Sequence, residues 1–195
     1  MNKITEKLLQ LVSDFQGEFR GAFNIREDGQ CAGRQSTENI QIDSKEDGPG
    51  LVIHVRPGTK GETVYIPACV THSNFDDLVY NDFYIGENAD VTIIAGCGIH
   101  NATCSDAEHD GIHTFYLSKN AKVRYVERHY ASGDGSGKKV FDPVTKIFLK
   151  EGACFIMEST QLGGVTYTDR KTYASVGKKA QLIVKEKILT EKDEK

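Results

Sequence analysis

The chain of 195 residues has a formal net charge of −4, with 38% hydrophobic and 27% charged residues. This composition is typical of a folded protein rather than a disordered one. It gives no reason to expect nucleic-acid binding, which needs a concentrated basic face, and no apolar run approaches the length of a membrane span. The five cysteines form an odd set without a disulfide-framework spacing, so we expect reduced thiols in a cytoplasmic protein.

The N-terminal segment predicts one short amphipathic helix. Five apolar residues within segment 4–15 fall on one helical stripe: Ile4, Leu8, Leu11, Val12 and Phe15. Asn2 or Thr5 is suited to cap the start of this helix, and Gly17 follows its expected end. We expect the helix to dock on the rest of the chain as a packing element.

The next segments predict irregular structure followed by short strands. Residues 18–36 are rich in glycine and lack a regular pattern, so no element is expected there. Apolar and polar residues then alternate at 40–42, 51–55 and 63–67, which indicates three short β-strands separated by turns.

From residue 83 onward the chain repeats one unit. The four copies cover 83–94, 115–126, 147–158 and 174–185. Ala89, Ala121, Ala153 and Ala180 align, separated by 32, 32 and 27 residues. Self-similarity at such a period is the signature of a solenoid, in which stacked turns bury one another's faces.

Within each copy the ninth and eleventh residues are apolar or large and share one strand face, as Val91 and Ile93 do. The residue before each aligned alanine is Asn, Asn, Gly and Lys, and Asn and Gly suit the left-handed backbone of a tight corner. This pattern predicts a mainly β chain, either a β-solenoid or a sheet sandwich, and equal spacing favours the solenoid. The glycine-rich spacer 132–139 is expected to be flexible.

One segment concentrates residues that bind soft metals. Five candidate ligands lie within 17 residues: Cys97, His100, Cys104, His109 and His113. Thiolate and imidazole groups bind zinc and iron, but this spacing matches no standard zinc module. Structural roles remain open for three of them: Cys97, flanked by glycines, as a buried space-filling thiol, His109 in a solvated turn, and His113 as a packed or surface side chain. No catalytic motif such as G-x-S-x-G, H-E-x-x-H or C-x-x-C is present.

Several motifs resemble the SufB/SufD family of iron–sulfur cluster assembly. They are A-D-V-T-I-I-A-G-C-G at 89–98, Y-L-S-K-N-A-K-V-R-Y-V at 116–126, D-P-V-T-K at 142–146 and Q-L-G-G-V at 161–165. Three more are similar to the short SufB/SufD-like branch of anaerobic bacteria and archaea: P-G-T-K-G-E at 57–62, D-L-V-Y-N at 77–81 and H-D-G-I-H at 109–113. The resemblance covers most of the chain from about residue 18.

The resemblance implies a right-handed parallel β-helix that acts as a scaffold for a transient iron–sulfur cluster. It further implies a SufC-type ATPase as partner, and a dimer with a SufB/SufD-type homologue or a second copy. Family members continue into further rungs and a helical region that docks the ATPase. The chain ends at Lys195, before those parts. We therefore expect a helix at 1–17 and a β-helix core at 18–195 that lacks the C-terminal rungs.

The resemblance also bears on individual site residues. Family members that accept sulfur place a cysteine shortly after the V-T-K stretch, and here the first thiol is Cys154, eight residues past Lys146. Cys154 is thus the candidate sulfur acceptor. His109 matches a family histidine that precedes the A-x-V-R-Y strand.

The sequence therefore predicts a cytoplasmic, non-enzymatic scaffold component of SUF-type assembly. Two other functions stay open. One is a metal-dependent enzyme on a β-solenoid or jelly-roll fold, and the other is a purely structural partner subunit.

Overall fold

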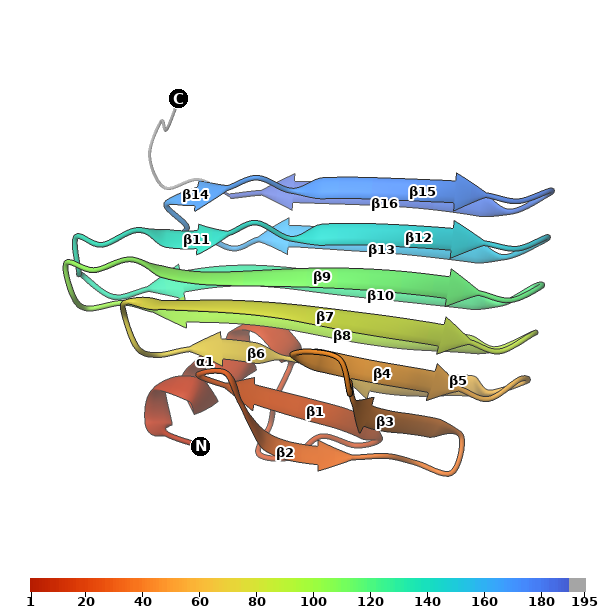
Figure 1. Cartoon of the computed structure of the whole chain (residues 1–195), viewed down its shortest axis with the longest axis horizontal. Coiled ribbons are helices and arrows are strands. Elements are labelled where there is room, and N and C mark those ends of the chain that lie inside the picture. Colours follow the sequence, from red (N-terminus) through yellow and green to blue (C-terminus); the bar gives the residue numbers. More distant parts are fainter. Residues whose placement is uncertain (190–195) are drawn as a thin grey trace.

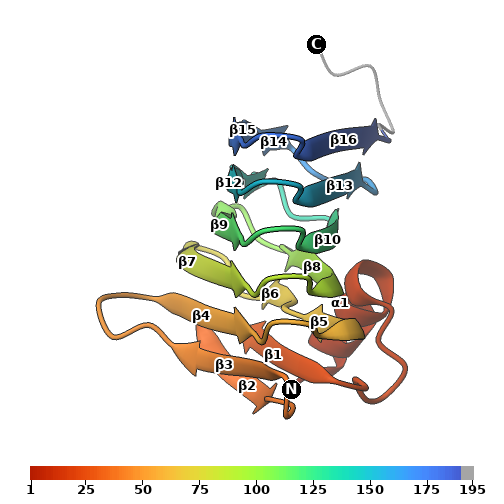
Figure 2. The same cartoon turned by 90° about the vertical axis from the view of Figure 1, so that its right-hand side faces the viewer.

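The computed structural model of the chain describes residues 1–189. They form a β-solenoid in which successive turns stack along one axis (Figure 1). Each turn contributes a strand to each of two facing sheets, which are seen edge on in Figure 2. The predicted mainly β solenoid is confirmed, and the sandwich alternative is excluded because the strands of a turn pair with the turns before and after it.

Within residues 1–189, sixteen strands build the two sheets. The first sheet contains β1 (Ala22–Glu27), β2 (Gln30–Gln35), β5 (Lys60–Tyr65), β6 (Ala68–Val70), β8 (Asp90–His100), β10 (Lys122–Ser132), β13 (Cys154–Gln161) and β16 (Gln181–Ile188). The second contains β3 (Ile40–Ser44), β4 (Gly50–Val55), β7 (Phe75–Ile85), β9 (Ala107–Leu117), β11 (Lys139–Phe141), β12 (Val144–Leu149), β14 (Tyr167–Thr168) and β15 (Lys171–Val176). Pairing is parallel except in the hairpins β1–β2 and β3–β4 at the N-terminal end.

The register of the first sheet reproduces the sequence repeat. Lys122 pairs with Asp90 on one side and with Cys154 on the other, and Cys154 pairs with Gln181. The residues before the aligned alanines all have left-handed backbone: Asn88, Asn120, Gly152 and Lys179 have φ of 59°, 57°, 70° and 57°. The predicted corners are therefore confirmed.

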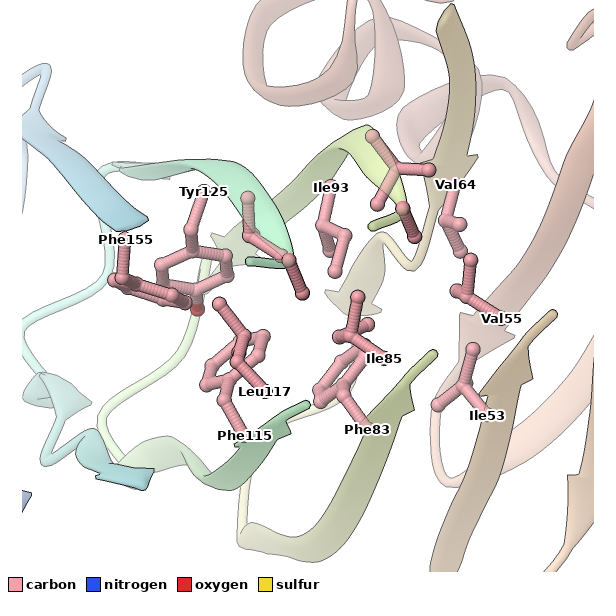
Figure 3. Close-up of a cluster of buried hydrophobic side chains, with 14 of the residues drawn as sticks. Ile53, Val55, Val64, Phe83, Ile85, Ile93, Phe115, Leu117, Tyr125 and Phe155 are labelled. Carbon is pink, nitrogen blue, oxygen red and sulfur yellow. The ribbon is translucent and has the colours of Figure 1, made fainter. Parts of the chain in front are cut away.

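The core lies between the sheets and has apolar clusters at both corners. In the larger cluster, Phe83 stacks on Phe115 from the next turn, with ring centroids 4.4 Å apart. Figure 3 shows Ile93 and Tyr125 of the first sheet pointing toward these rings. The smaller cluster, which includes Cys97 and Phe141, lies near the opposite corner. A band of buried polar side chains separates the two clusters.

Helix α1 (Lys3–Ser13) packs on the outer face of the first sheet (Figure 2). Asn2 caps it by accepting hydrogen bonds from two backbone N–H groups. Leu8, Leu9 and Val12 are buried, whereas Ile4 and Leu11 are 38% and 48% exposed. The predicted stripe was therefore partly wrong, because the docked face is rotated toward Leu9. Among the described residues, no helix is long and apolar enough to cross a membrane.

The prediction of irregular structure in segment 18–36 is wrong. Segment 18–36 contains the hairpin β1–β2, whose turn is formed by Asp28 and Gly29 with positive φ. The spacer 132–139 stacks on the corner of the preceding turn, and the N–H of Gly135 donates to the carbonyl of Asn101 over 3.2 Å. A Cβ on Gly135 would lie 2.3 Å from backbone atoms of Thr103. These glycines therefore permit close stacking of the backbone.

Candidate site in the solenoid interior

Adjacent strands bring two sequence motifs together inside the solenoid. Asp77 and Asn81 of β7 pair in register with His109 and His113 of β9. Side chains alternate between the two faces of a strand, so residues four apart share the inward face. All four side chains are buried. The motifs D-L-V-Y-N and H-D-G-I-H thus supply one interior cluster.

Cys97 approaches this cluster from the opposite sheet. Its glycine neighbours in β8 face helix α1, and a Cβ on Gly96 would lie 2.2 Å from the carbonyl oxygen of Val12. The thiol therefore faces inward, is 4% exposed and lines the same interior cavity as His109. His109 is 3% exposed within β9, so its assignment to a solvated turn is wrong.

Beyond Cys97, a basic, an acidic and a second basic side chain follow in a row: His109, Asp77 and Arg26. His109 Nδ1 lies 3.1 Å from Asp77 Oδ2, and Arg26 of β1 donates to both carboxylate oxygens of Asp77 over 2.6 to 3.0 Å. Burial would lower the pKa of His109, but the electrostatic interaction with Cys97 and the hydrogen bond to Asp77 raise it to about 10. Burial would likewise raise the pKa of Asp77, but His109 and Arg26 hold it well below its usual value. The imidazolium is thus flanked by Asp77 and the thiol.

His113 is held differently. The backbone N–H of Leu51 donates to Asn81 Oδ1 over 3.0 Å, which turns the Asn81 amide nitrogen toward His113 Nε2 at 3.2 Å. Nε2 must then accept, so Nδ1 carries the proton and donates to the Tyr125 hydroxyl over 2.7 Å. Tyr125 in turn donates to Glu127 over 3.0 Å. Burial lowers the pKa of His113 to about 4, so the ring is neutral with both nitrogens engaged.

The polar band continues toward the last turn through Glu127. This carboxylate is 1% exposed and accepts hydrogen bonds from Ser159 and Arg170. Burial would raise the pKa of Glu127, but His129 and Arg170 lower it to about 2. Arg170 also donates to His129 Nδ1 over 2.9 Å. Each buried charge in this part of the band therefore has partners, as a low-dielectric interior requires.

A cavity of about 260 Å³ opens onto the cluster at the N-terminal end of the solenoid. Its polar lining includes Arg26, Arg34, Asn81, Cys97, His109 and His113. Three of the predicted site residues, Cys97, His109 and His113, thus line one cavity, and the other three lie outside it. Cys104 is exposed in the corner at 101–106, and His100 is half-buried with Nδ1 3.0 Å from the Ser132 hydroxyl. Cys154 is half-buried and alternates with the inward-facing Phe155.

The cavity offers few ligands for a metal. Among the described residues, the one group of three potential metal-binding side chains comprises Asp76, Glu108 and Asp110, whose oxygens lie within 4.8 Å of one another. These residues alternate with Asp77 and His109 and so face outward. Burial and the neighbouring Asp110 raise the pKa of Glu108 to about 7. Inside the cavity, Cys97 supplies one sulfur and His109 one imidazole, which must give up a proton before it can bind a metal.

Reasoning from the sequence missed several residues of this site: Arg26, Arg34, Asp77, Asn81 and Tyr125. The repeat period contains a signal for two of them. Adding 32 to Asp77 and Asn81 gives His109 and His113, so the solenoid register predicts both pairs. Arg26 and Arg34 lie in a segment that was expected to be irregular, where no register was available.

No protein-family model matches the chain. The chain is similar to an iron–sulfur cluster assembly SufBD family protein of Archaeoglobus fulgidus, to which it is 29% identical over 151 residues. The aligned residues cover 77% of this chain and 39% of the relative. The chain therefore spans well under two thirds of the relative's length. This similarity, in a chain that folds as a β-solenoid, supports a SufB/SufD-like family assignment.

Proposed function

We propose that the chain is a cytoplasmic scaffold component of SUF-type iron–sulfur cluster assembly and is not itself an enzyme. The similarity to a protein named for iron–sulfur cluster assembly supports the general process. The partners belong to the proposal as well. They are a SufC-type ATPase and either a SufB/SufD-type homologue or a second copy of this chain.

The observation that carries the proposal is that Cys97 and His109 line the same interior cavity. Cysteine sulfur is the protein ligand that iron–sulfur clusters use most, and Cys97 offers one such sulfur inside the cavity beside His109. Asp77 holds the imidazole through a hydrogen bond, and Arg26 in turn donates to Asp77. The pair is therefore suited to hold iron or sulfide in transit.

The small number of ligands limits what the cavity holds. A complete cluster is commonly bound by four protein ligands, and the cavity offers Cys97 and His109. We therefore propose that this chain binds a partial iron–sulfide species, whose remaining coordination comes from sulfide or from a partner. His113 has a structural part in this proposal, because its ring nitrogens already bind Asn81 and Tyr125.

Anaerobic reconstitution with ferrous iron and sulfide tests the proposal. Bound iron, acid-labile sulfide and visible absorbance are measured per chain for wild type, Cys97→Ser and His109→Gln. Cys104→Ser and Cys154→Ser are matched controls, because they remove thiols outside the cavity. We expect the iron and sulfide to be lost in the first two variants and kept in the controls.

Other outcomes separate the alternatives. Tight iron or zinc without labile sulfide favours a metal-dependent enzyme. No metal together with clear dimerisation favours a purely structural subunit. If Cys104→Ser or Cys154→Ser loses binding while Cys97→Ser keeps it, the iron and sulfide bind outside the cavity.

The ATPase partnership has its own test. The purified chain is mixed with a purified SufC-type ATPase, and complex formation is measured by sedimentation with and without ATP. A complex supports the partnership, and two separate species contradict it for this stretch of chain.

A further inference from the structure

The charged side chains that line the interior cavity are all basic. Two guanidinium groups, those of Arg26 and Arg34, line it together with His109, and no carboxylate is among its lining residues. Asp77 lies behind this lining, where it pairs with Arg26 and His109. Asp77 therefore balances the positive charge of these two residues and not that of Arg34.

Arg34 differs from Arg26 because its partners are neutral. Its Nε donates to Asn24 Oδ1 over 2.8 Å, and one terminal nitrogen donates to the Ser44 hydroxyl over 3.0 Å. Within residues 1–189, no carboxylate pairs with it. A half-buried, uncompensated guanidinium attracts small anions, since its field is only partly screened by water.

The strand register shows how far the edge strand β2, which carries Arg34, lies from Cys97. Cys31 of β2 pairs with Arg26 of β1, Arg26 pairs with Ala68 of β6, and Ala68 pairs with Cys97 of β8. Three strand steps separate Cys31 from Cys97, or about 14 Å at the usual spacing between strands. Cys31 is exposed and lines the same cavity as the buried Cys97. The cavity therefore runs from the edge strand of the sheet to the Cys97–His109 pair.

We propose that this cavity is the entrance for a small monoanion, which Arg34 attracts and the Cys97–His109 pair receives. A volume of about 260 Å³ is roughly that of nine liquid waters, so it admits a small ion and excludes a folded peptide. The identification of this anion as hydrosulfide rests on the proposed function. The anion selectivity of the entrance does not.

Alkylation by two reagents of similar size and different charge tests the entrance. Iodoacetate and iodoacetamide both react when a thiolate attacks the CH₂ carbon, forming a C–S bond and releasing iodide. Rates at Cys97 and Cys104 are read from the same wild-type chain by mass spectrometry of their separate peptides. Cys104, in its exposed corner, reports the intrinsic preference between the reagents.

We expect the iodoacetate-to-iodoacetamide rate ratio to be higher at Cys97 than at Cys104. One charge at about 14 Å changes such a ratio by roughly twofold, so Arg34→Gln should lower the ratio at Cys97 by that factor and leave Cys104 unchanged. Arg34→Lys should retain the ratio, and raising the salt concentration should reduce it.

The entrance is overturned if Cys97 reacts with neither reagent in the folded chain, or if Arg34→Gln leaves its ratio unchanged. Neither result depends on iron. If Cys97 reacts with charge selectivity but the chain assembles no iron–sulfide species, the anion entrance is supported and hydrosulfide is rejected as its substrate. The converse result, assembly without charge selectivity, removes only the entrance.

Discussion

His109 and Asp77 face each other across adjacent turns of the solenoid, with 3.1 Å between Nδ1 and Oδ2. They are 32 residues apart, which is the repeat period, and Asn81 and His113 are related by the same step. In the apolar core this step stacks Phe83 on Phe115. The same pairing of β7 with β9 thus stacks aromatic rings in one part of the interior and joins polar side chains in another. This happens because paired residues of parallel strands point to the same face of the sheet.

Replacing Asp77 by Asn should destabilise the chain and discharge His109. The amide cannot balance Arg26 and the imidazolium, and removing one partner of a buried ion pair costs about 3–5 kcal/mol. The free energy of unfolding from urea titration measures the first effect. The ¹⁵N chemical shifts of the His109 ring measure the second, and we expect the His109 pKa to fall toward that of an ordinary imidazole.

Asp76→Asn is the matched control, because the same change is made one residue away on the outward face of β7. It should change stability by less than about 0.5 kcal/mol. Equal losses in the two variants would show that the strand, rather than the ion pair, responds to the substitution.

The interior histidines should give stability a maximum near pH 6.5. Burial lowers the pKa of both His113 and His129 to about 4. The unfolded chain then binds protons that the folded chain does not, so stability is lost as the pH falls from about 6.5 to about 4. His109 has the opposite sign, because its folded pKa is raised to about 10. Its contribution is complete below about pH 6.5 and is lost as the pH rises toward 10.

Each imidazole contributes a slope of at most about 1.4 kcal/mol per pH unit. Urea unfolding at intervals across this range measures both limbs. His109→Gln should weaken the alkaline limb and keep the acidic one. A wild-type stability that rises from neutral to alkaline pH contradicts the assignment of His109 as the protonated partner of Asp77.

Most of the solenoid could be predicted because its signals are local and repeated. Asn88, Asn120 and Gly152 precede buried alanines at a fixed period, and each adopts the left-handed backbone that its residue type favours. The hairpin β1–β2 was missed because its glycines were interpreted as loop residues, whereas Gly29 serves a tight turn. A glycine-rich segment can thus form either a loop or a hairpin, and here the pairing of β1 with β2 makes it a hairpin.

The site was predicted less completely because it depends on pairing between distant segments. Cys97 and His109 were candidates by residue type alone. Their place in one cavity follows from the packing of helix α1 on Gly96 and Gly98, which turns the thiol inward. Arg26 reaches Asp77 across 51 residues, and no local pattern reports such a contact. Cys104 has the same chemistry as Cys97 but lies in an exposed corner.

Replacing Gly96 by Ala should displace helix α1. The new Cβ would lie 2.2 Å from the Val12 carbonyl oxygen and 2.5 Å from its carbon, and a backbone contact cannot be relieved by a side-chain rotation. We expect a loss of about 1–3 kcal/mol in the free energy of unfolding, typical of overpacking, and faster proteolysis within residues 3–13. Gly48→Ala is the control, since a Cβ there meets nothing within 4 Å.

Replacing Lys179 by Asn should stabilise the last corner. Lys179 adopts φ of 57° at the position that Asn88, Asn120 and Gly152 occupy in the earlier turns. Left-handed backbone is costly for most side chains, and Asn tolerates it better than Lys because its short polar group can bond locally. We expect a gain of about 0.5–1 kcal/mol, comparable to other relieved backbone strain, and Lys179→Gly should gain at least part of it.

The gain should come from the backbone alone. In the first two corners the amide of Asn120 donates to Asn88 over 3.3 Å, but Gly152 has no side chain to extend this ladder to residue 179. Lys178→Asn makes the same chemical change at a position without positive φ and should leave stability unchanged. Urea midpoints compare the variants. A loss of stability in Lys179→Asn would mean that the Lys179 side chain contributes contacts worth more than the strain of its backbone.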